Sequence, residues 1–465
     1  MATVQHSFVT LWNALSESGD AASRSFQDAE ASIPCIDLLS GSALYGRAEE
    51  LQGRSVLLAT KSQLTTASAL IELDGVARRI VLCPPDLPLE HLPYVIETAE
   101  VDGIVSDQVM TRLGKPRPLY FSPCSRNLAP ATLSGTRSHQ TEWVLLTSGT
   151  TGLPKLVIHT FASLTAAIQP RRESSKIVWS TFYDIRRYGG LQILLRAALT
   201  GTSLVLTSSD EPTSAFLVRA AETGVTHISG TPSQWRRALM SPSAHLIAPE
   251  YVRLSGEAVD QAILNKLRSF YPNAKIVHAF ASTEAGVAFE VTDGESGFTP
   301  ETLQAGSHAE LKIEDHSLRV RSAGNARCYL GEGMPPIRDG EGFVDTTDIV
   351  ELRDGRYYFA GRRDGVINVG GLKVHPEEVE AVIGRHPEVQ MCLVRSKKSP
   401  VTGALVIADV VLKPDAASDG AASAIHDDIL QLCRETLPAH KVPAAINIVP
   451  ELNVAGSGKV VRRNA

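Results

Sequence analysis

Leu146-Thr147-Ser148-Gly149-Thr150-Thr151-Gly152-Leu153-Pro154-Lys155 is the stretch that decides how this sequence is interpreted. It directly continues the apolar run Trp143–Leu146, and Val157-Ile158 follow it, so two predicted strands flank a loop of small residues. Glycines let a backbone approach an anion closely, and successive N–H groups and hydroxyls can surround phosphate oxygens while a lysine supplies positive charge. The stretch is not the nucleotide-binding loop GxxxxGK[ST], because only two residues separate Gly149 from Gly152. It predicts a phosphate-binding loop of another kind.

Short apolar runs alternate with helical patterns before about residue 300. Ser55–Ala59, Arg79–Cys83 and Gly103–Val105 are typical of buried strands, and Gln63–Leu73 and His91–Glu100 have the apolar spacing of helices. The strand-like runs that follow are Lys176–Trp179, Ser203–Leu206, His227-Ile228 and Lys275–Val277. Strands that alternate with helices predict parallel βαβ units and an α/β domain.

After about residue 300 the pattern changes to shorter strands and turns. Asp354-Gly355 predicts a tight hairpin between Ile349–Leu352 and Tyr357–Phe359. The elements predicted beyond it are helix Pro376–Arg385, strand Val389–Arg395, strand Leu405–Leu412, a loop at 415–423 and helix Ala424–Glu435. The polar, glycine-containing segment 361–365 separates the two regions. We therefore expect a large domain at residues 1–363 and a small α+β domain at 364–465.

Composition excludes several classes of protein. The 465 residues are 43% hydrophobic and 21% charged, which suits two or more domains with ample cores. No apolar run approaches the roughly 18 residues of a membrane helix. The 45 basic and 51 acidic residues are spread without long blocks, which gives no electrostatic footprint for nucleic acid or an anionic membrane. Six scattered cysteines and the absence of a visible secretory signal favour reduced thiols in a soluble cytoplasmic protein.

The phosphate-loop sequence resembles that of the adenylate-forming superfamily, which includes acyl-CoA synthetases, peptide-synthetase adenylation domains and luciferases. The resemblance runs in order from about Gly53 to Arg462 and is carried by five motifs. It implies a large N-terminal domain of two doubly wound α/β subdomains plus a small β-barrel, followed by a small mobile α+β lid. It also implies an ATP-dependent carboxylic acid:CoA ligase. The carboxylate attacks the α-phosphorus of Mg-ATP, which gives acyl-adenylate and pyrophosphate, and the CoA thiol then displaces AMP.

The resemblance also assigns roles to individual residues. Thr283 would contact the α-phosphate, and Glu284 would bind Mg²⁺, which prefers hard oxygen ligands. Asp348 and Arg362 would hold the ribose hydroxyls, and Lys459 would reach the attacking and leaving oxygens during adenylation. The predicted catalytic residues are therefore Thr283, Glu284 and Lys459. The predicted ATP- and AMP-binding residues are Thr147, Ser148, Gly149, Thr150, Thr151, Gly152, Lys155, Ser255, Gly256, Glu257, Ala258, Ala279, Phe280, Ala281, Ser282, Asp348 and Arg362.

Two positions of the third motif differ from the usual family sequence. Phe280 stands where the family often has tyrosine, and Ala281 stands where it often has glycine. The first position lacks a hydroxyl, and the second places a methyl group on the expected wall of the acyl pocket. Neither change removes a phosphate or metal ligand.

The choice of acid depends on the segment Phe182–Leu191. Arg187 occupies the place of a histidine found in many CoA ligases, and Asp184 lies near, but out of register with, the aspartate that binds the substrate ammonium in amino-acid-activating relatives. The predicted pocket residues are Tyr183, Asp184, Arg187, Tyr188 and Ala281. The charged pair could recognise a polar or second charged group on the acid. Alternatively, Asp184 and Arg187 pair with other residues of the protein.

The segment Ile367–Glu380 resembles the part of CoA ligases that swings onto the active site after adenylation. The resemblance makes Asp364 the hinge and places Gly370, Gly371 and Lys373 in the CoA channel. The implied partners are a small carboxylic acid, ATP and either CoA or a carrier protein, with no nucleic acid and no membrane span.

Three alternative functions stay open. The first is a stand-alone adenylation enzyme that passes the acyl group to a carrier-protein thiol or an amine. The second is a non-catalytic nucleotide-binding relative, which would be expected to lack Glu284 or Lys459, yet both are present. The third is a nicotinamide enzyme. The sequence speaks against this alternative, because no GxGxxG motif follows an early strand.

Overall fold

The structure is a computed structural model that describes residues 9–108, 120–131, 137–147, 153–170, 176–208, 210–304, 308–369, 372–399, 403–416 and 421–452. Predicted site residues outside these ranges are Ser148, Gly149, Thr150, Thr151, Gly152, Gly370, Gly371 and Lys459. The roles given to them above stay predictions.

A seven-stranded sheet forms the first part of the fold, in the order β19-β10-β9-β5-β4-β6-β7. Strands β9, β5, β4, β6 and β7 run parallel, whereas β10 and β19 are antiparallel additions at one edge. The strands are β4 Ser55–Leu58, β5 Arg79–Leu82, β6 Gly103–Ser106, β7 Tyr120–Pro123, β9 Glu142–Thr147, β10 Lys155–Thr160 and β19 Cys328–Leu330. The accompanying helices are α3 Gln63–Leu73, α4 Leu92–Thr98 and α5 Phe161–Thr165.

A second, eight-stranded sheet has the order β16-β15-β14-β13-β11-β12-β1-β2, and all neighbours from β15 to β1 are parallel. Its strands are β1 Ser25–Gln27, β2 Ser32–Pro34, β11 Val178–Thr181, β12 Ser203–Leu206, β13 His227–Gly230, β14 Tyr251–Ser255, β15 Lys275–Ser282 and β16 Gly286–Val291. Its helices are α6 Tyr188–Thr200, α7 Thr213–Glu222, α8 Pro232–Ala238 and α9 Gln261–Phe270. The two parallel sheets confirm the doubly wound α/β prediction.

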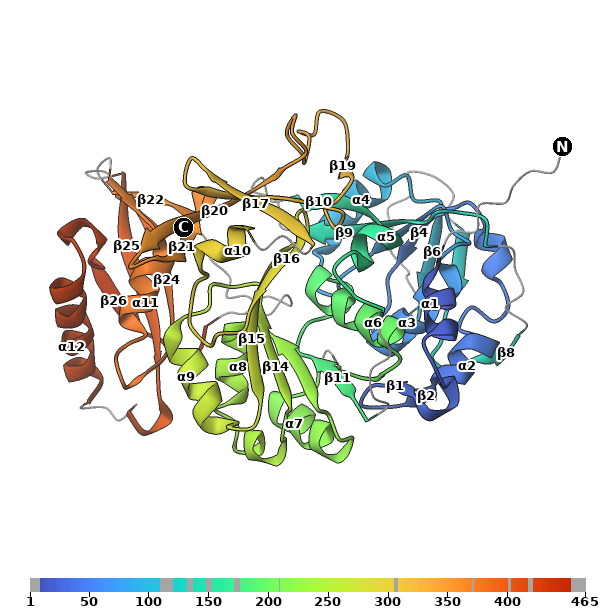
Figure 1. The fold of residues 1–465 in the computed structure, drawn as a ribbon, viewed down its shortest axis with the longest axis horizontal. Coiled ribbons are helices and arrows are strands. Elements are labelled where there is room, and N and C mark those ends of the chain that lie inside the picture. The colour runs from blue at the N-terminus through green and yellow to red at the C-terminus, as the bar shows by residue number, and fades with distance from the viewer. Residues whose placement is uncertain are drawn as a thin grey trace.

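The largest apolar cluster joins these two sheets. It contains Leu58 and Leu82 of the first sheet, Leu204 and Leu206 of the second, and most of the buried residues of α3 and α6. A second cluster packs α7, α8 and α9 against β13, β14 and β15. Helices α3 and α6 therefore lie in the core between the sheets, and α7, α8 and α9 cover the outer face of the second sheet (Figure 1).

The third part is a four-stranded antiparallel sheet in the order β17-β18-β20-β21, where the small β-barrel was expected. Its strands are β17 Ala309–Glu314, β18 Ser317–Ser322, β20 Val344–Arg353 and β21 Arg356–Arg362, and α10 Pro300–Gln304 precedes them. Asp354 and Gly355 have φ values of 49° and 77°, as the predicted two-residue hairpin requires.

The C-terminal elements have an apolar cluster of their own, whose buried members run from Ile367 to Ile446. These elements are β22 Ile367–Val369, β23 Leu372–Val374, α11 Pro376–Ile383, β24 Val389–Ser399, β25 Gly403–Leu412, α12 Ala421–Thr436 and β26 Ala445–Ile448. They lie beside α8 and α9 at the left of Figure 1. The predicted loop at 415–423 is too long, because α12 already begins at Ala421.

The N-terminal region contains short elements that the sequence did not predict: α1 Leu11–Glu17, α2 Cys35–Ser40, β3 Gly41–Ser42 and β8 Ala129–Pro130. Thr10 and Asn13 form a capping box at the start of α1, which buries Leu11 and Leu15. Across the described ranges, none of the helices has the length and apolar character needed to cross a membrane.

Candidate active site

Three predicted segments meet at one edge of the second sheet. Strands β11, β13, β14 and β15 are adjacent and parallel, so their carboxyl ends lie side by side. Phe182-Tyr183 follows β11, Gly256-Glu257 follows β14, and Thr283-Glu284 follows β15. Ligands of open α/β sheets bind in the crevice outside the carboxyl ends of the strands. The second and third motifs and the predicted acyl-pocket segment are therefore neighbours in space.

The predicted phosphate loop is the connection between β9 and β10. Lys155 lies opposite Thr147 in the antiparallel ladder, so the two ends of the loop are fixed against each other. The Oγ1 atom of Thr147 is buried and has no hydrogen-bond partner among the described residues. The Nζ atom of Lys155 lies 5.3 Å from the ring centroid of Tyr329.

His159 links β10 to the turn after β15. Its Nε2 lies 2.7 Å from the carbonyl oxygen of Thr283, and its Nδ1 lies 3.0 Å from Ser163 Oγ. Since a carbonyl oxygen can only accept, Nε2 carries the proton. Burial lowers the pKa of His159 to about 4, so the ring is neutral near pH 7. This contact joins the strand after the phosphate loop to the Thr283-Glu284 turn, and no sequence motif predicted it.

Glu284 is half-buried and held from two sides. Its Oε1 accepts a hydrogen bond of 3.2 Å from the Tyr329 hydroxyl, and its backbone oxygen accepts one of 2.8 Å from Ala326 N. Among the described residues, no group of three or more His, Cys, Asp and Glu side chains could hold a metal. Mg²⁺ usually keeps several waters and binds through one or two carboxylates plus substrate phosphates. The single half-buried carboxylate of Glu284, which Tyr329 connects to Lys155 at the end of the predicted phosphate loop, therefore fits Mg²⁺.

A register shift divides the end of β15 between Phe280 and Ala281. Phe280 pairs with Phe289, and its ring stacks on Phe289 at 5.8 Å and on Phe359 at 5.1 Å. Ala281 instead packs against the cluster between the two sheets, which contains Tyr188. The extra residue of this bulge lies in β16, so Phe280 and Ala281 are simply successive residues of β15 and point to opposite faces of the sheet. Ala281 is therefore on the side of the cluster between the two sheets.

The second motif is held by its neighbours. The Tyr183 hydroxyl donates a hydrogen bond of 2.6 Å to the backbone oxygen of Ser255. Glu257 Oε2 accepts one of 3.0 Å from Ser233 N in the first turn of α8. Gly256 has φ +85°, which favours glycine. The Glu257 side chain therefore contacts α8.

The charged residues of the predicted acyl pocket are paired inside the protein. Asp184 Oδ1 accepts hydrogen bonds from the backbone N and the Nε of Arg186, at 2.8 and 2.7 Å. Arg186 is fully buried and also donates to the carbonyl oxygen of Thr60. Arg187 forms an ion pair with Asp86. The structure therefore contains the alternative left open above, in which both charges pair with other residues. Arg186, which the sequence analysis passed over, is the arginine that binds Asp184.

The ribose-binding prediction falls on the β20–β21 hairpin. Asp348 and Arg362 are opposite each other in its ladder, and an Arg362 guanidinium nitrogen donates to Thr347 Oγ1 at 2.8 Å. The stack of Phe359 on Phe280 places this hairpin against the end of β15. The hairpin that carries the predicted ribose residues therefore lies beside the strand that leads to the Thr283-Glu284 turn.

The predicted hinge residue, Asp364, lies in the turn directly after strand β21. Arg363 forms an ion pair of 3.1 Å with Asp345, and Asp364 lies in the 3₁₀ turn Arg363–Gly365. Lys373 lies on β23 and is exposed.

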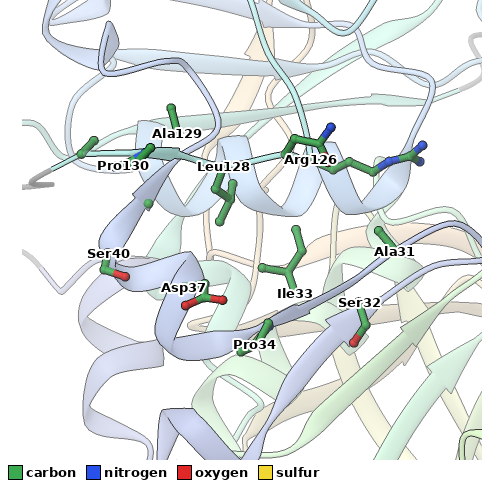
Figure 2. A pocket seen from close by; sticks show the side chains of 13 residues that line it. Ala31, Ser32, Ile33, Pro34, Asp37, Ser40, Arg126, Leu128, Ala129 and Pro130 are labelled. Atoms are coloured by element: carbon green, nitrogen blue, oxygen red, sulfur yellow. The ribbon is translucent and has the colours of Figure 1, made fainter.

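A surface hollow of about 830 Å³ lies elsewhere, between α2 and β8. Ile33 and Leu128 project into it from opposite sides (Figure 2). Arg126, at its edge, forms an ion pair with Glu30. Of the predicted site residues that the structure describes, none lines this hollow.

Comparison with known proteins identifies the family. The AMP-binding enzyme family matches residues 76–332, more than half of the chain, and the AMP-binding enzyme C-terminal domain matches residues 378–459. The chain belongs to the AMP-binding enzyme family. This confirms the resemblance to adenylate-forming enzymes that the motifs carry.

Two kinds of curated protein illustrate the relatives of this AMP-binding enzyme. The 2-succinylbenzoate–CoA ligase of Salmonella typhimurium is 27% identical over 377 residues, which cover 77% of this chain and 76% of that protein. The dimodular nonribosomal peptide synthase of Bacillus subtilis is 25% identical over 364 residues. That alignment covers 70% of this chain but only 15% of the synthase, so the chain spans a small part of that relative.

Solved structures share the fold of this AMP-binding enzyme. The anthranilate CoA ligase AuaEII, in complex with anthranoyl-AMP, superposes with a TM-score of 0.79 at 19% identity, covering 97% of this chain and 96% of that one. The amide bond synthetase McbA from Marinactinospora thermotolerans superposes with a TM-score of 0.76 at 18% identity, covering 97% and 98%. Both likenesses confirm the predicted arrangement of a large N-terminal and a small C-terminal part.

Proposed function

We propose that the protein is an AMP-forming acid–thiol ligase, which activates a carboxylic acid with ATP and transfers the acyl group to CoA. The observation that carries this proposal is the hydrogen bond between His159 and Thr283, because it joins the strand after the phosphate loop to the turn that carries Glu284. Family membership and the similarity to a CoA ligase over most of both chains support the same activity.

In the first half-reaction, the substrate carboxylate would attack the α-phosphorus of ATP and pyrophosphate would leave. Negative charge builds on the phosphoryl oxygens as this happens, and preorganised cations and donors stabilise it. Lys155, Thr283 and Lys459 are our candidates for those groups. Glu284 would hold Mg²⁺, whose charge, when it is bound, offsets that of the phosphates. The β20–β21 hairpin would hold the ribose through Asp348 and Arg362.

In the second half-reaction, the CoA thiol would attack the acyl carbonyl and AMP would leave. Both nucleophiles belong to the substrates, so the protein's part is positioning and charge stabilisation. We propose that residues 364–465 form a lid that turns about Asp364 between the two steps. Gly370, Gly371 and Lys373 would then line the path of the thiol. The separate apolar cluster from Ile367 to Ile446 supports a unit that can move as one body.

A second candidate differs only in the acceptor. The likeness to an amide bond synthetase, and the match to part of a nonribosomal peptide synthase, favour testing an amine and a carrier-protein thiol beside CoA. Both candidates use the same first half-reaction. We place either enzyme in the cytoplasm, in agreement with the composition.

The experiment that tests the proposal is ATP–pyrophosphate exchange with aryl, short-chain, dicarboxylic and amino acids, followed by product analysis with each acceptor. Exchange that depends on one class of acid, and an acyl-CoA product, would support the ligase. An amide or acyl-carrier product would favour the second candidate, and no exchange with any acid would refute both.

A further inference from the structure

Tyr329 lies between two of the residues assigned to the phosphate end of the site, although no motif contains it. It is the middle residue of β19, which pairs antiparallel with β10 and places Tyr329 opposite Val157. Val157 is two residues beyond Lys155 on β10. A segment that is remote in sequence thus contributes a side chain beside the phosphate-loop lysine.

The two ends of the Tyr329 side chain make different contacts. Its hydroxyl donates to Glu284 Oε1 at 3.2 Å, since a carboxylate can only accept. Its ring lies 5.3 Å from Lys155 Nζ, within the range of a cation–π interaction.

The backbone around Tyr329 is bound to both sides of the site. Ala326 N donates to the backbone oxygen of Glu284, and Arg327 N donates to that of Ile158, each at 2.8 Å. The β10–β19 ladder continues the attachment through Leu156 and Leu330. The position of Tyr329 is therefore fixed relative to the Thr283-Glu284 turn and to β10 together.

We infer that Tyr329 is a positioning residue that holds the Glu284 carboxylate and the Lys155 ammonium in one arrangement, so that carboxylate and ammonium meet the magnesium-bound phosphates of ATP together. This inference rests on the proposed function. The hydroxyl binds Oε1 of Glu284, so Oε2 would be the atom that binds the ion. The ring limits the positions that the flexible lysine side chain can take. Outer partners of this kind commonly change metal affinity by about 10- to 100-fold when they are removed.

Tyr329→Phe removes the hydroxyl and keeps the ring. We expect the Mg²⁺ concentration for half-maximal ATP–pyrophosphate exchange to rise about 10-fold, while the rate at saturating Mg²⁺ stays within about 3-fold of wild type. A second readout needs no turnover: calorimetry with a non-hydrolysable ATP analogue. The affinity of the variant should fall at limiting Mg²⁺ and match wild type without Mg²⁺.

Tyr329→Leu removes the ring as well. It should also weaken binding of the analogue without Mg²⁺, because Lys155 loses its ring contact. If this variant does not fold, Tyr329→Phe alone still decides the role of the hydroxyl. The matched control is Tyr271→Phe, which deletes a buried hydroxyl that donates to the backbone oxygen of Ala244 at 2.9 Å.

The outcomes separate this inference from the proposed function. No exchange by the wild-type protein would refute the proposed function itself. Exchange by wild type, with Mg²⁺ titrations of Tyr329→Phe and wild type that superimpose, would overturn the role of Tyr329. A Mg²⁺ shift of the same size in Tyr271→Phe would overturn it too, because the effect would then follow the loss of any buried hydroxyl.

Discussion

His159 Nε2 donates a 2.7 Å hydrogen bond to the carbonyl oxygen of Thr283, and this bond connects β10 with the end of β15. The ring is fully buried and neutral, so the contact is not exchanged for water. Two family motifs that are more than a hundred residues apart in the sequence are thereby held in one geometry. The first prediction concerns this bond.

His159→Leu should lower the rate of ATP–pyrophosphate exchange by about 10- to 100-fold. The carbonyl oxygen of Thr283 would lose its hydrogen-bond donor, so the Thr283-Glu284 turn would shift. A displacement of about 1 Å can lower a rate by about 100-fold. His227→Leu is the control. Burial lowers the pKa of His227 to about 4 as well, but its ring packs on Trp179 and Tyr251 instead of contacting the Thr283-Glu284 turn. Equal losses of exchange in both variants would show that His159 acts through stability alone.

Glu284→Gln should shift the Mg²⁺ dependence of exchange further than any change at Tyr329. A neutral amide replaces a charged oxygen ligand, so we expect a Mg²⁺ requirement at least about 100-fold higher. Glu310→Gln makes the same chemical change in an exposed ion pair with Arg321 and should leave the titration unchanged. An unaltered Mg²⁺ titration of Glu284→Gln would remove this residue from the metal site.

Ala281→Gly should extend the range of acids toward bulkier acyl groups. The Ala281 methyl group packs against the cluster that contains Tyr188, so its removal would enlarge the predicted pocket. A single methyl discriminates by roughly 1–3 kcal/mol, which corresponds to about 10- to 200-fold in relative kcat/KM. Competition assays with paired acids measure this ratio. An unchanged ranking of acids would place Ala281 away from the substrate.

Asp74 should give the stability a measurable pH dependence. Its carboxylate accepts hydrogen bonds from Leu11 N at 2.7 Å and from Trp143 Nε1 at 3.1 Å, and burial raises its pKa from 3.8 to about 6. The folded state therefore binds more protons than the unfolded state between these two values. The contribution of Asp74 to the free energy of unfolding is greatest below pH 4 and falls, by about 3 kcal/mol in total, as the pH rises to about 7.

Asp74→Asn cannot titrate, so urea unfolding of both proteins from pH 4 to 8 isolates this effect. The stability advantage of wild type over the variant should shrink by about 3 kcal/mol between pH 4 and 7 and then stay constant. A difference that does not change with pH would mean that Asp74 titrates alike in the folded and unfolded chains.

Local sequence patterns predicted much of the parallel sheets. Gln63–Leu73 is a helix over the predicted span, and Ser55–Leu58 is a strand, because apolar periodicity and local caps determine such elements. The bulge at Phe280/Ala281 was not predictable in the same way, since it depends on how β15 pairs with β16.

Contacts between distant segments account for the rest of what was missed. Arg186 and Arg187 are adjacent in sequence, and no local pattern shows which of them binds Asp184. Arg186 does so, in a buried position where it also donates to the carbonyl oxygen of Thr60. Tyr329 comes near Glu284 through the pairing of β19 with β10, and no local pattern indicates that pairing. Such residues are found only once the fold is known.

The central claim, that this site makes an acyl-adenylate, is tested most directly by a single-turnover experiment without an acceptor. Wild-type protein is mixed with MgATP and an acid selected by the exchange assay, and pyrophosphate and protein-bound products are measured by mass spectrometry. We predict a burst of about one pyrophosphate per active site, a bound acyl-adenylate, and its loss to AMP and acyl-CoA when CoA is added. Release of ADP and phosphate, or a covalent acyl-enzyme in place of the acyl-adenylate, would contradict the account.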